Sequence, residues 1–256
     1  MGDHSTWFHL LPGYQNLEDW AKHYLERKSF LITMFEHQFS LTHVVVAAFV
    51  AVLLIIGALA YRGRVSKDRA DRLVPERGLG IRNLFELVLE ATLSIAESVM
   101  GRKKAEKYLP LVGTLVFFIL FNNLIGLVPG FLPATDTLKT NFALSGTVFI
   151  MYHVFGVMEH GLKYFKHFAG PVWYLAWLMI PIEIISHVAR LFSLALRLMG
   201  NIAADHKVVS AFFVLVPILV PLPFMVLGLL VCVVQTLVFS LLTMVYIDMA
   251  VAHEEH

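Results

Sequence analysis

The stretch PIEIISHVARLFSLALRLMGN, residues 181–201, lies inside an apolar segment that spans residues 173–216. A helix needs about twenty apolar residues to cross a bilayer, so a segment about twice that length predicts a helix that tilts strongly, bends or folds back as a hairpin. Arg197 lies in the middle of this segment. A cation at bilayer depth costs about 2.5–3.5 kcal/mol on insertion scales, so this arginine needs either a partner or a function.

The composition indicates the environment of this segment. Of the 256 residues, 58% are hydrophobic and only 15% are charged, and the formal net charge is +1. These proportions are typical of an integral membrane protein and not of a soluble domain. The only cysteine, Cys232, excludes a disulfide framework and a multi-cysteine metal site. We expect an outer N-terminal segment, residues 1–41, followed by a single transmembrane domain, residues 42–256.

Four further apolar segments are close to the length that crosses a bilayer, at residues 43–61, 108–132, 142–162 and 224–250. Residues 83–100 differ, because glutamates interleave with apolar side chains; this pattern predicts an amphipathic helix along the inner membrane surface. The sequence therefore predicts an all-α membrane protein with five to six transmembrane helices and one interfacial helix. The last of them, within residues 173–250, are expected to form a long tilted hairpin-like pair.

The distribution of basic residues predicts the orientation. Seven lysines and arginines lie between Arg62 and Arg82, whereas the connection at residues 134–141 contains only Lys139. By the positive-inside rule, the basic loop is cytoplasmic. We therefore expect the N-terminus outside and the C-terminus in the cytoplasm.

Polar residues within the long segment share one helix face. Their spacings of four, three, seven and four residues keep them in a narrow stripe at 100° per residue: Glu183, His187, Arg190, Arg197 and Asn201. Lipid cannot satisfy such a stripe, so it must face protein, water or ions. The first three residues suit either structural pairing or function. Arg197 has no acidic residue three or four positions away on its own helix, which favours a functional role with a partner elsewhere.

Several of these residues carry a resemblance. The stretches PIEIIS (181–186) and LALRLMGN (194–201), with QTLVFSLLTMVYIDMA (235–250) and the closing Glu254-Glu255-His256, resemble subunit a of F-type ATP synthases. The stretch FNNLIGLVP (121–129) is similar to the same family more loosely. The resemblance implies a membrane subunit of a rotary motor in the bacterial inner membrane, not an enzyme on its own. Protons would enter by one half-channel, bind a carboxylate of a rotating c ring, and leave by a second half-channel.

The resemblance also implies roles for individual residues. Arg197 would face the c-ring carboxylate, and its guanidinium, which stays protonated, would separate the two aqueous paths. The outer path would contain Asn201, Asp205, His206 and Gln235, and the inner path Glu183, Ser186 and Ser193. The implied partners are the c ring, b-type peripheral stalk subunits, the rest of the complex and membrane lipid, with no nucleic acid, cofactor or metal. The coupling ion, H⁺ or Na⁺, stays open.

Two positions depart from the commonest family pattern. His206 stands where a glutamate is usual, and Gly228 stands where a histidine is expected. A histidine can relay protons as a carboxylate does. Its partner is predicted to be either Asp205 or a group on residues 142–162. The possible relay residues are His153, Glu159, His160, His187 and Arg190.

Two other functional classes, a haem or metal protein and a stand-alone transporter, fit part of the sequence. His153, His160 and His167 recur every seven residues, which would suit a haem or metal site, but there is no HExxH motif and no second histidine pair at similar spacing. The main alternative is a stand-alone membrane ion or solute transporter. Such folds usually contain an internal repeat, and we find none between the two halves of the chain.

Overall fold

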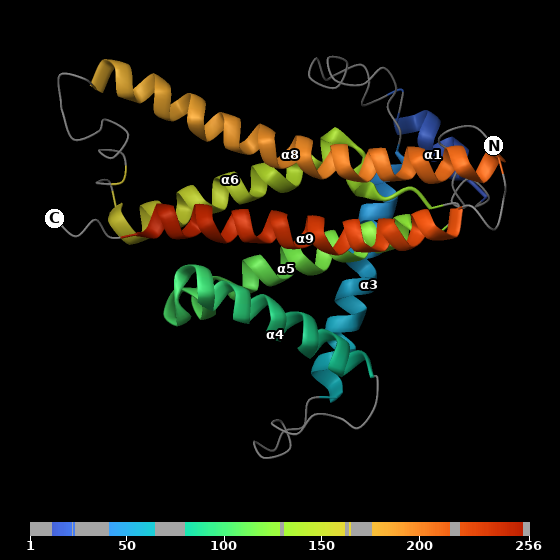
Figure 1. Cartoon of the computed structure of the whole chain (residues 1–256), viewed down its shortest axis with the longest axis horizontal. Helices are drawn as coiled ribbons and strands as arrows, with labels where there is room; N and C mark the ends of the chain where they lie inside the picture. Colours follow the sequence, from blue (N-terminus) through green and yellow to red (C-terminus); the bar gives the residue numbers. More distant parts are fainter. Residues whose placement is uncertain are drawn as a thin grey trace.

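The computed structural model describes residues 12–21, 23, 41–64, 80–128, 131–161, 164, 176–215 and 221–252. Within these ranges the regular elements are helices, and none is a strand. The predictions for most of residues 1–41, for most of the basic loop, for His167 and for residues 254–256 lie outside the described residues. The predicted all-α fold class is confirmed (Figure 1).

The helices follow the predicted segments closely. In chain order they are α1 (Tyr14–Ala21), α3 (Thr42–Arg64), α4 (Ile81–Met100), α5 (Arg102–Gly126), the 3-10 turn η4 (Ala134–Asp136), α6 (Leu138–His160), α8 (Ala176–Leu215) and α9 (Pro221–Val251). Five of these are long and apolar enough to cross a membrane: α3, α5, α6, α8 and α9. The prediction of five to six transmembrane helices is thereby narrowed to five within the described ranges.

Helix α8 continues without a break for 40 residues. At 1.5 Å per residue it is about 60 Å long. Pro181 lies near its amino end, where a lost backbone hydrogen bond does not interrupt the rest of the helix. The unbroken helix excludes the expected alternative that this segment folds back on itself. The axis of α8 changes direction along its length, in agreement with the expected bend (Figure 1). The tilt in the membrane stays a prediction. The hairpin-like pair forms instead between α8 and α9, which run side by side in opposite directions (Figure 1).

Helix α5 has different ends from those predicted. It begins six residues before Tyr108, because the lysines of its first two turns pair with neighbouring helices: Lys104 Nζ lies 2.7 Å from Asp248 Oδ1, and Lys107 Nζ lies 2.7 Å from Glu159 Oε2. It ends at Gly126 and not near residue 132, because the chain turns there to enter η4. The lysines therefore misplaced the predicted start of this span, and the turn into η4 misplaced its predicted end.

Helices α4, α5, α6, α8 and α9 share one core, and α3 packs in a second, smaller apolar cluster with η4 and the end of α5. Helix α6 contacts both α8 and α9, and α5 packs on α9 and α4, whereas α3 crosses the other long helices at a steep angle (Figure 1). The largest buried apolar side chains of the core are Ile119, Tyr152, Leu198, Phe239 and Met244. Many apolar side chains on α3, α8 and α9 point outward, as expected where helices face lipid or a partner.

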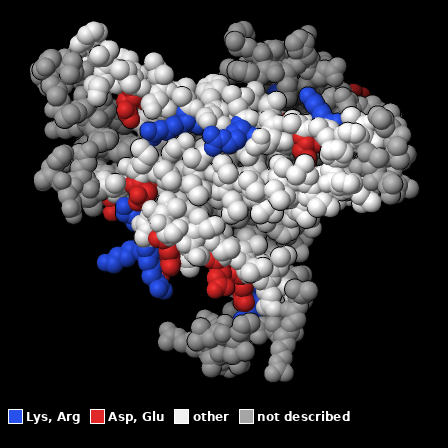
Figure 2. Space-filling view, in the orientation of Figure 1, with Lys and Arg blue, Asp and Glu red and all other residues white. Residues whose placement is uncertain are grey.

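Helix α4 confirms the helix predicted for residues 83–100. Ala96 and Met100 are buried in the common core, whereas Leu84 and Leu87 are 48% and 65% exposed. Charged side chains gather over α4 and the start of α5, while the surface over α8 and α9 is mostly uncharged apart from a few basic and acidic groups (Figure 2). The position of α4 along the inner membrane surface stays a prediction.

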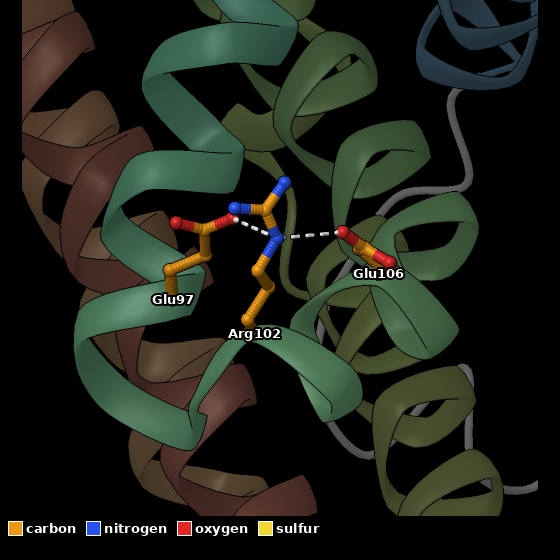
Figure 3. Close-up of polar contacts among 3 residues, drawn as sticks. All are labelled: Glu97, Arg102 and Glu106. Carbon is orange, nitrogen blue, oxygen red and sulfur yellow. Dashed lines mark hydrogen bonds and ion pairs between the residues drawn. The ribbon is translucent and has the colours of Figure 1, made fainter.

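A sharp corner joins α4 to α5 at Gly101. Gly101 has φ 77° and ψ 158°, a conformation that is essentially restricted to glycine. The corner places Arg102 between two acidic side chains: its Nε donates to Glu106 Oε1 at 3.1 Å and lies 3.8 Å from Glu97 Oε1 (Figure 3). Because Arg102 is 78% exposed, these pairs contribute little, and the backbone of Gly101 is the stronger determinant of the corner.

Replacing this glycine tests the corner. Gly101→Ala is expected to destabilise the chain by about 1–3 kcal/mol, because alanine has to adopt a backbone conformation reserved for glycine. The midpoint of heat-induced aggregation of the detergent-solubilised complex measures the effect. Gly146→Ala is the control, since this glycine lies in α6 and an added Cβ has no neighbour within 4 Å. Equal midpoints for the two variants would contradict the assignment.

Candidate functional site

Arg197 lies near the middle of α8, on a face that points away from the bundle. Leu194, Ala195 and Leu198 are at most 3% exposed and fix this side of the helix against the core. Leu196 is 52% exposed, and Arg197 itself is exposed. Within the described residues Arg197 makes no hydrogen bond or ion pair. A cation in apolar surroundings at this depth is expected to be satisfied by water or by a group from outside the chain.

One turn further along α8, Asn201 joins this helix to α9. Its Nδ2 donates a hydrogen bond to Gln235 Oε1 at 2.6 Å. Gln235 is 3% exposed, and its Nε2 is buried without a hydrogen-bond partner among the described residues. A buried amide group of this kind is costly to leave unsatisfied, so it marks a place for water or for a partner group.

A groove of about 420 Å³ lies beside this hydrogen bond, between α8 and α9. Its polar lining comes from Asn201, Asp205 and Gln235, and the other lining residues are apolar. The volume is large enough for several water molecules. The structure therefore brings three of the predicted outer-path residues to one groove.

Asp205 occupies the space that a side chain at position 228 would need. A Cβ built on Gly228 would lie 2.5 Å from Asp205 Oδ2, and Gly228 is buried. Real Cβ atoms do not approach a carboxylate oxygen that closely, so Asp205 or α9 would have to move. The glycine that departs from the family pattern thus faces a carboxylate from the neighbouring helix.

His206 packs against the end of α5 and the turn that follows it. Its Nε2 would lie 2.7 Å from a Cβ on Gly126, beside Pro133. Asp136, in the adjacent η4 turn, is close enough to act on the charge of His206. Asp136 and His206 are far apart in the sequence, so the sequence alone gives no sign that they lie close together.

The η4 turn is held by buried hydrogen bonds. Thr135 Oγ1 donates to Asn123 Oδ1 at 2.7 Å, and Asn141 Nδ2 donates to the Thr135 carbonyl at 2.7 Å. Three further amide atoms in this region are buried without a partner among the described residues: Asn122 Oδ1, Asn123 Nδ2 and Asn141 Oδ1. The sequence hinted at this polar layer only through the asparagine pair at 122–123.

The other half of α8 contains a second polar group. His187 Nε2 lies 3.3 Å from Glu183 Oε1, and His187 Nδ1 lies 2.7 Å from the Tyr152 hydroxyl on α6. The His153 ring is 4.9 Å from the His187 ring. Arg190 packs over the Tyr246 ring at 5.5 Å and forms no ion pair with Glu183 among the described residues. Of the three residues that suit structural pairing, Glu183 and His187, four positions apart, form a pair in the structure.

The remaining predicted residues lie apart from these groups. Ser186 is half-buried and Ser193 exposed, and neither side chain makes a hydrogen bond within the described ranges. Glu159 pairs with Lys107 of α5, and His160 ends α6.

His153 of α6 lies against His187, and His187 is nineteen residues, about 28 Å, from His206 along α8. His153 is therefore too distant to be the partner of His206. Asp205 stays a predicted partner, and Asp136 is a further acidic group near His206. No three His, Cys, Asp or Glu side chains gather into a metal site within the part of the chain that the structure describes.

Comparison with known proteins identifies the family. Residues 42–248 match the family described as ATP synthase A chain. The chain is 51% identical over 212 residues to ATP synthase subunit a 1 of Syntrophotalea carbinolica, covering 83% of this chain and 86% of that protein. It is 47% identical over 200 residues to ATP synthase subunit a of Bdellovibrio bacteriovorus (78% and 86%), and 44% identical over 196 residues to that of Geobacter sulfurreducens (77% and 81%).

This match excludes the alternative of a stand-alone transporter, and the five apolar helices agree with a multi-pass protein of the inner membrane. The chain therefore belongs to the ATP synthase A chain family, as the proton-translocating membrane subunit of that complex and not as an enzyme on its own.

Proposed function

We propose that Arg197 is the fixed cation that faces the proton-binding carboxylate of a c ring. The observation that supports this most is its exposure on the outer face of α8 without a partner among the described residues. A positive charge within about 4–6 Å favours the ionised form of a carboxylate, so each ring site would release its proton as it passes. The guanidinium itself does not deprotonate, which keeps protons from crossing directly between the two paths.

The outer half-channel is proposed to follow the groove between α8 and α9. The groove is lined by Asn201, Asp205 and Gln235, and His206 directly follows Asp205 in the sequence. The partnerless Nε2 of Gln235 supports water in this region. Protons would pass from His206 and Asp205 toward the ring carboxylate near Arg197.

The inner half-channel is proposed to lie at the other end of α8. Glu183, Ser186 and Ser193 precede Arg197 on this helix, and His187 and Arg190 lie among them. The contacts of His187 with Glu183 and with α6 place titratable groups close together there. His153, Glu159 and His160 belong to the same end of α6.

The proposed function also includes the orientation of the chain in the membrane and its contacts with other subunits. The N-terminus would lie outside the cell and the C-terminus in the cytoplasm, as the basic residues between 62 and 82 favour. The exposed apolar side chains of α8 and α9 suit contact with a c ring or with lipid. A b-type peripheral stalk would hold the subunit still while the ring turns.

Removing the guanidinium tests the central assignment. Arg197→Ala is expected to lower ATP synthesis and ATP-driven proton pumping below about a tenth of the parent rate, because the ring site loses the charge that favours ionisation. Both activities are measured in inverted membrane vesicles, with the amount of membrane-inserted chain followed by immunoblot. Lys207→Ala removes another exposed cation of α8 and serves as the control. Pumping by the Arg197→Ala variant at the parent rate would refute the assignment.

The outer path is tested at His206. His206→Ala is expected to slow proton entry several-fold and to alter its pH profile, since an unperturbed imidazole changes charge between about pH 5 and 8. His206→Glu is expected to restore part of the rate, because a carboxylate also carries protons. ATP synthesis driven by an imposed pH gradient, measured at several outer pH values, reports both effects. Parent-like profiles for both variants would exclude His206 from the path.

The place of Asp205 is tested through its neighbour. Gly228→Ala is expected to slow pumping several-fold. The added Cβ would lie 2.5 Å from Asp205 Oδ2 and would push this carboxylate out of its position. If that displacement is the cause, adding Gly228→Ala to Asp205→Ala should slow pumping no further than Asp205→Ala alone. Additive losses would show that position 228 acts independently of Asp205.

A further inference from the structure

We propose that Tyr152, His187 and Glu183 form a proton relay across the contact between α6 and α8. The proposal rests on the function proposed above and names the groups that carry protons along the inner path. Tyr152 has no part in the sequence pattern of the long segment, because it comes from a different helix. Its position next to His187 is visible only in the fold.

The geometry of the three groups supports a continuous chain. His187 uses both ring nitrogens, Nδ1 at 2.7 Å from the Tyr152 hydroxyl and Nε2 at 3.3 Å from Glu183 Oε1. A neutral imidazole donates from one nitrogen and accepts at the other, so it can take a proton on one side and release one on the other. A tyrosine hydroxyl is also both donor and acceptor.

The two ends of the chain have different surroundings. Tyr152 is 2% exposed and His187 is 8% exposed, whereas the side chain of Glu183 is 37% exposed. At the buried end, Tyr152 lines a cavity of about 10 Å³ with Ser145, Arg190 and Tyr246. That space suits about one water molecule with polar partners. The chain therefore connects an accessible carboxylate with a small cavity whose lining is half polar and half apolar, the apolar residues being Val148, Phe149, Leu191 and Leu194.

A proton would move along the chain as follows. Protonated Glu183 gives its proton to Nε2, Nδ1–H gives its proton to the Tyr152 oxygen, and the original hydroxyl proton passes to water in the cavity. One proton has then moved from Glu183 to water, and Tyr152 is a neutral phenol again. The imidazole is left as the Nε2–H tautomer, and exchange with water, which removes a proton from Nε2 and returns one to Nδ1, restores the first tautomer. The reverse sequence carries a proton in the opposite direction.

Neighbouring rings hold the relay in place. Tyr152 and His187 rings are 5.8 Å apart with an angle of 21°, and the His153 ring lies 4.9 Å from His187. Arg190 lies over the Tyr246 ring, and both residues line the cavity together with Tyr152. The same contacts would also tie α6 to α8, so a purely structural role predicts loss of the assembled complex when the hydroxyl is removed.

The decisive variant is Tyr152→Phe in the complete ATP synthase, reconstituted into liposomes. It removes one hydroxyl and keeps the ring. ATP synthesis and ATP-driven pumping per assembled complex are expected to fall at least about tenfold, since positioned proton transfer contributes roughly 10²–10⁴-fold. The ratio of rates in H₂O and D₂O is expected to rise, because proton transfer becomes rate-limiting. Tyr108→Phe, at another buried tyrosine that packs on Phe155, is the matched control and should behave like the parent.

A second variant tests whether the groups act as one chain. His187→Gln keeps polar atoms in place but cannot exchange protons, and it should slow both activities as Tyr152→Phe does. The double variant should be no slower than the slower single variant, because either change breaks the same chain.

Three results would overturn the relay. They are unchanged rates in Tyr152→Phe, losses only in proportion to missing complex, and additive losses in the double variant. The failure of the relay is distinguishable from the failure of the proposed function. If Tyr152→Phe transports protons normally while Arg197→Ala stays blocked, only the relay is wrong. If both variants transport protons normally, the function proposed for Arg197 fails as well.

Discussion

The length of α8 limits how this helix can lie in the membrane and how deep its polar side chains are. The helix is about 60 Å long, whereas the hydrocarbon core of a bilayer is about 30 Å thick. If the whole helix stays within the core, it lies about 60° from the membrane normal and gains only about 0.75 Å of depth per residue. Glu183 and His206 then differ from Arg197 in depth by only about 10 Å and 7 Å. Both ends of the polar stripe stay below the membrane surface, and water has to reach them from opposite sides.

Among the described residues, several polar groups of α8 bond to neighbouring helices, whereas the cation Arg197 faces outward. Asn201 bonds to Gln235, His187 to Tyr152 and Glu183, and Arg190 rests on the Tyr246 ring. Arg197 lies between Leu196 and Leu198 and makes no such contact within the described ranges. An uncompensated charge in an apolar setting carries a large desolvation cost. This cost supports the proposal that the partner of Arg197 is a group of a neighbouring subunit.

Much of this fold follows from the sequence, because apolar length and helical period are local properties. The five long helices and α4 lie where the pattern predicts them, and Arg197 stands out by its charge alone. What the sequence did not contain was the pairing between helices. The early start of α5 depends on Asp248 and Glu159, which lie far along the chain from the lysines they meet. The contacts of Tyr152 with His187 and of Asp205 with Gly228 depend on the same kind of long-range geometry.

The close approach of Asp205 to Gly228 has an evolutionary consequence. Because the carboxylate fills the space beside the glycine, a larger residue at 228 requires the Asp205 side chain or α9 to move. We therefore expect substitutions at 205 and 228 to depend on each other, so that a side chain on α9 is best accepted together with a shorter one on α8. Protein engineers who graft one arrangement onto the other would have to exchange both positions in the same step.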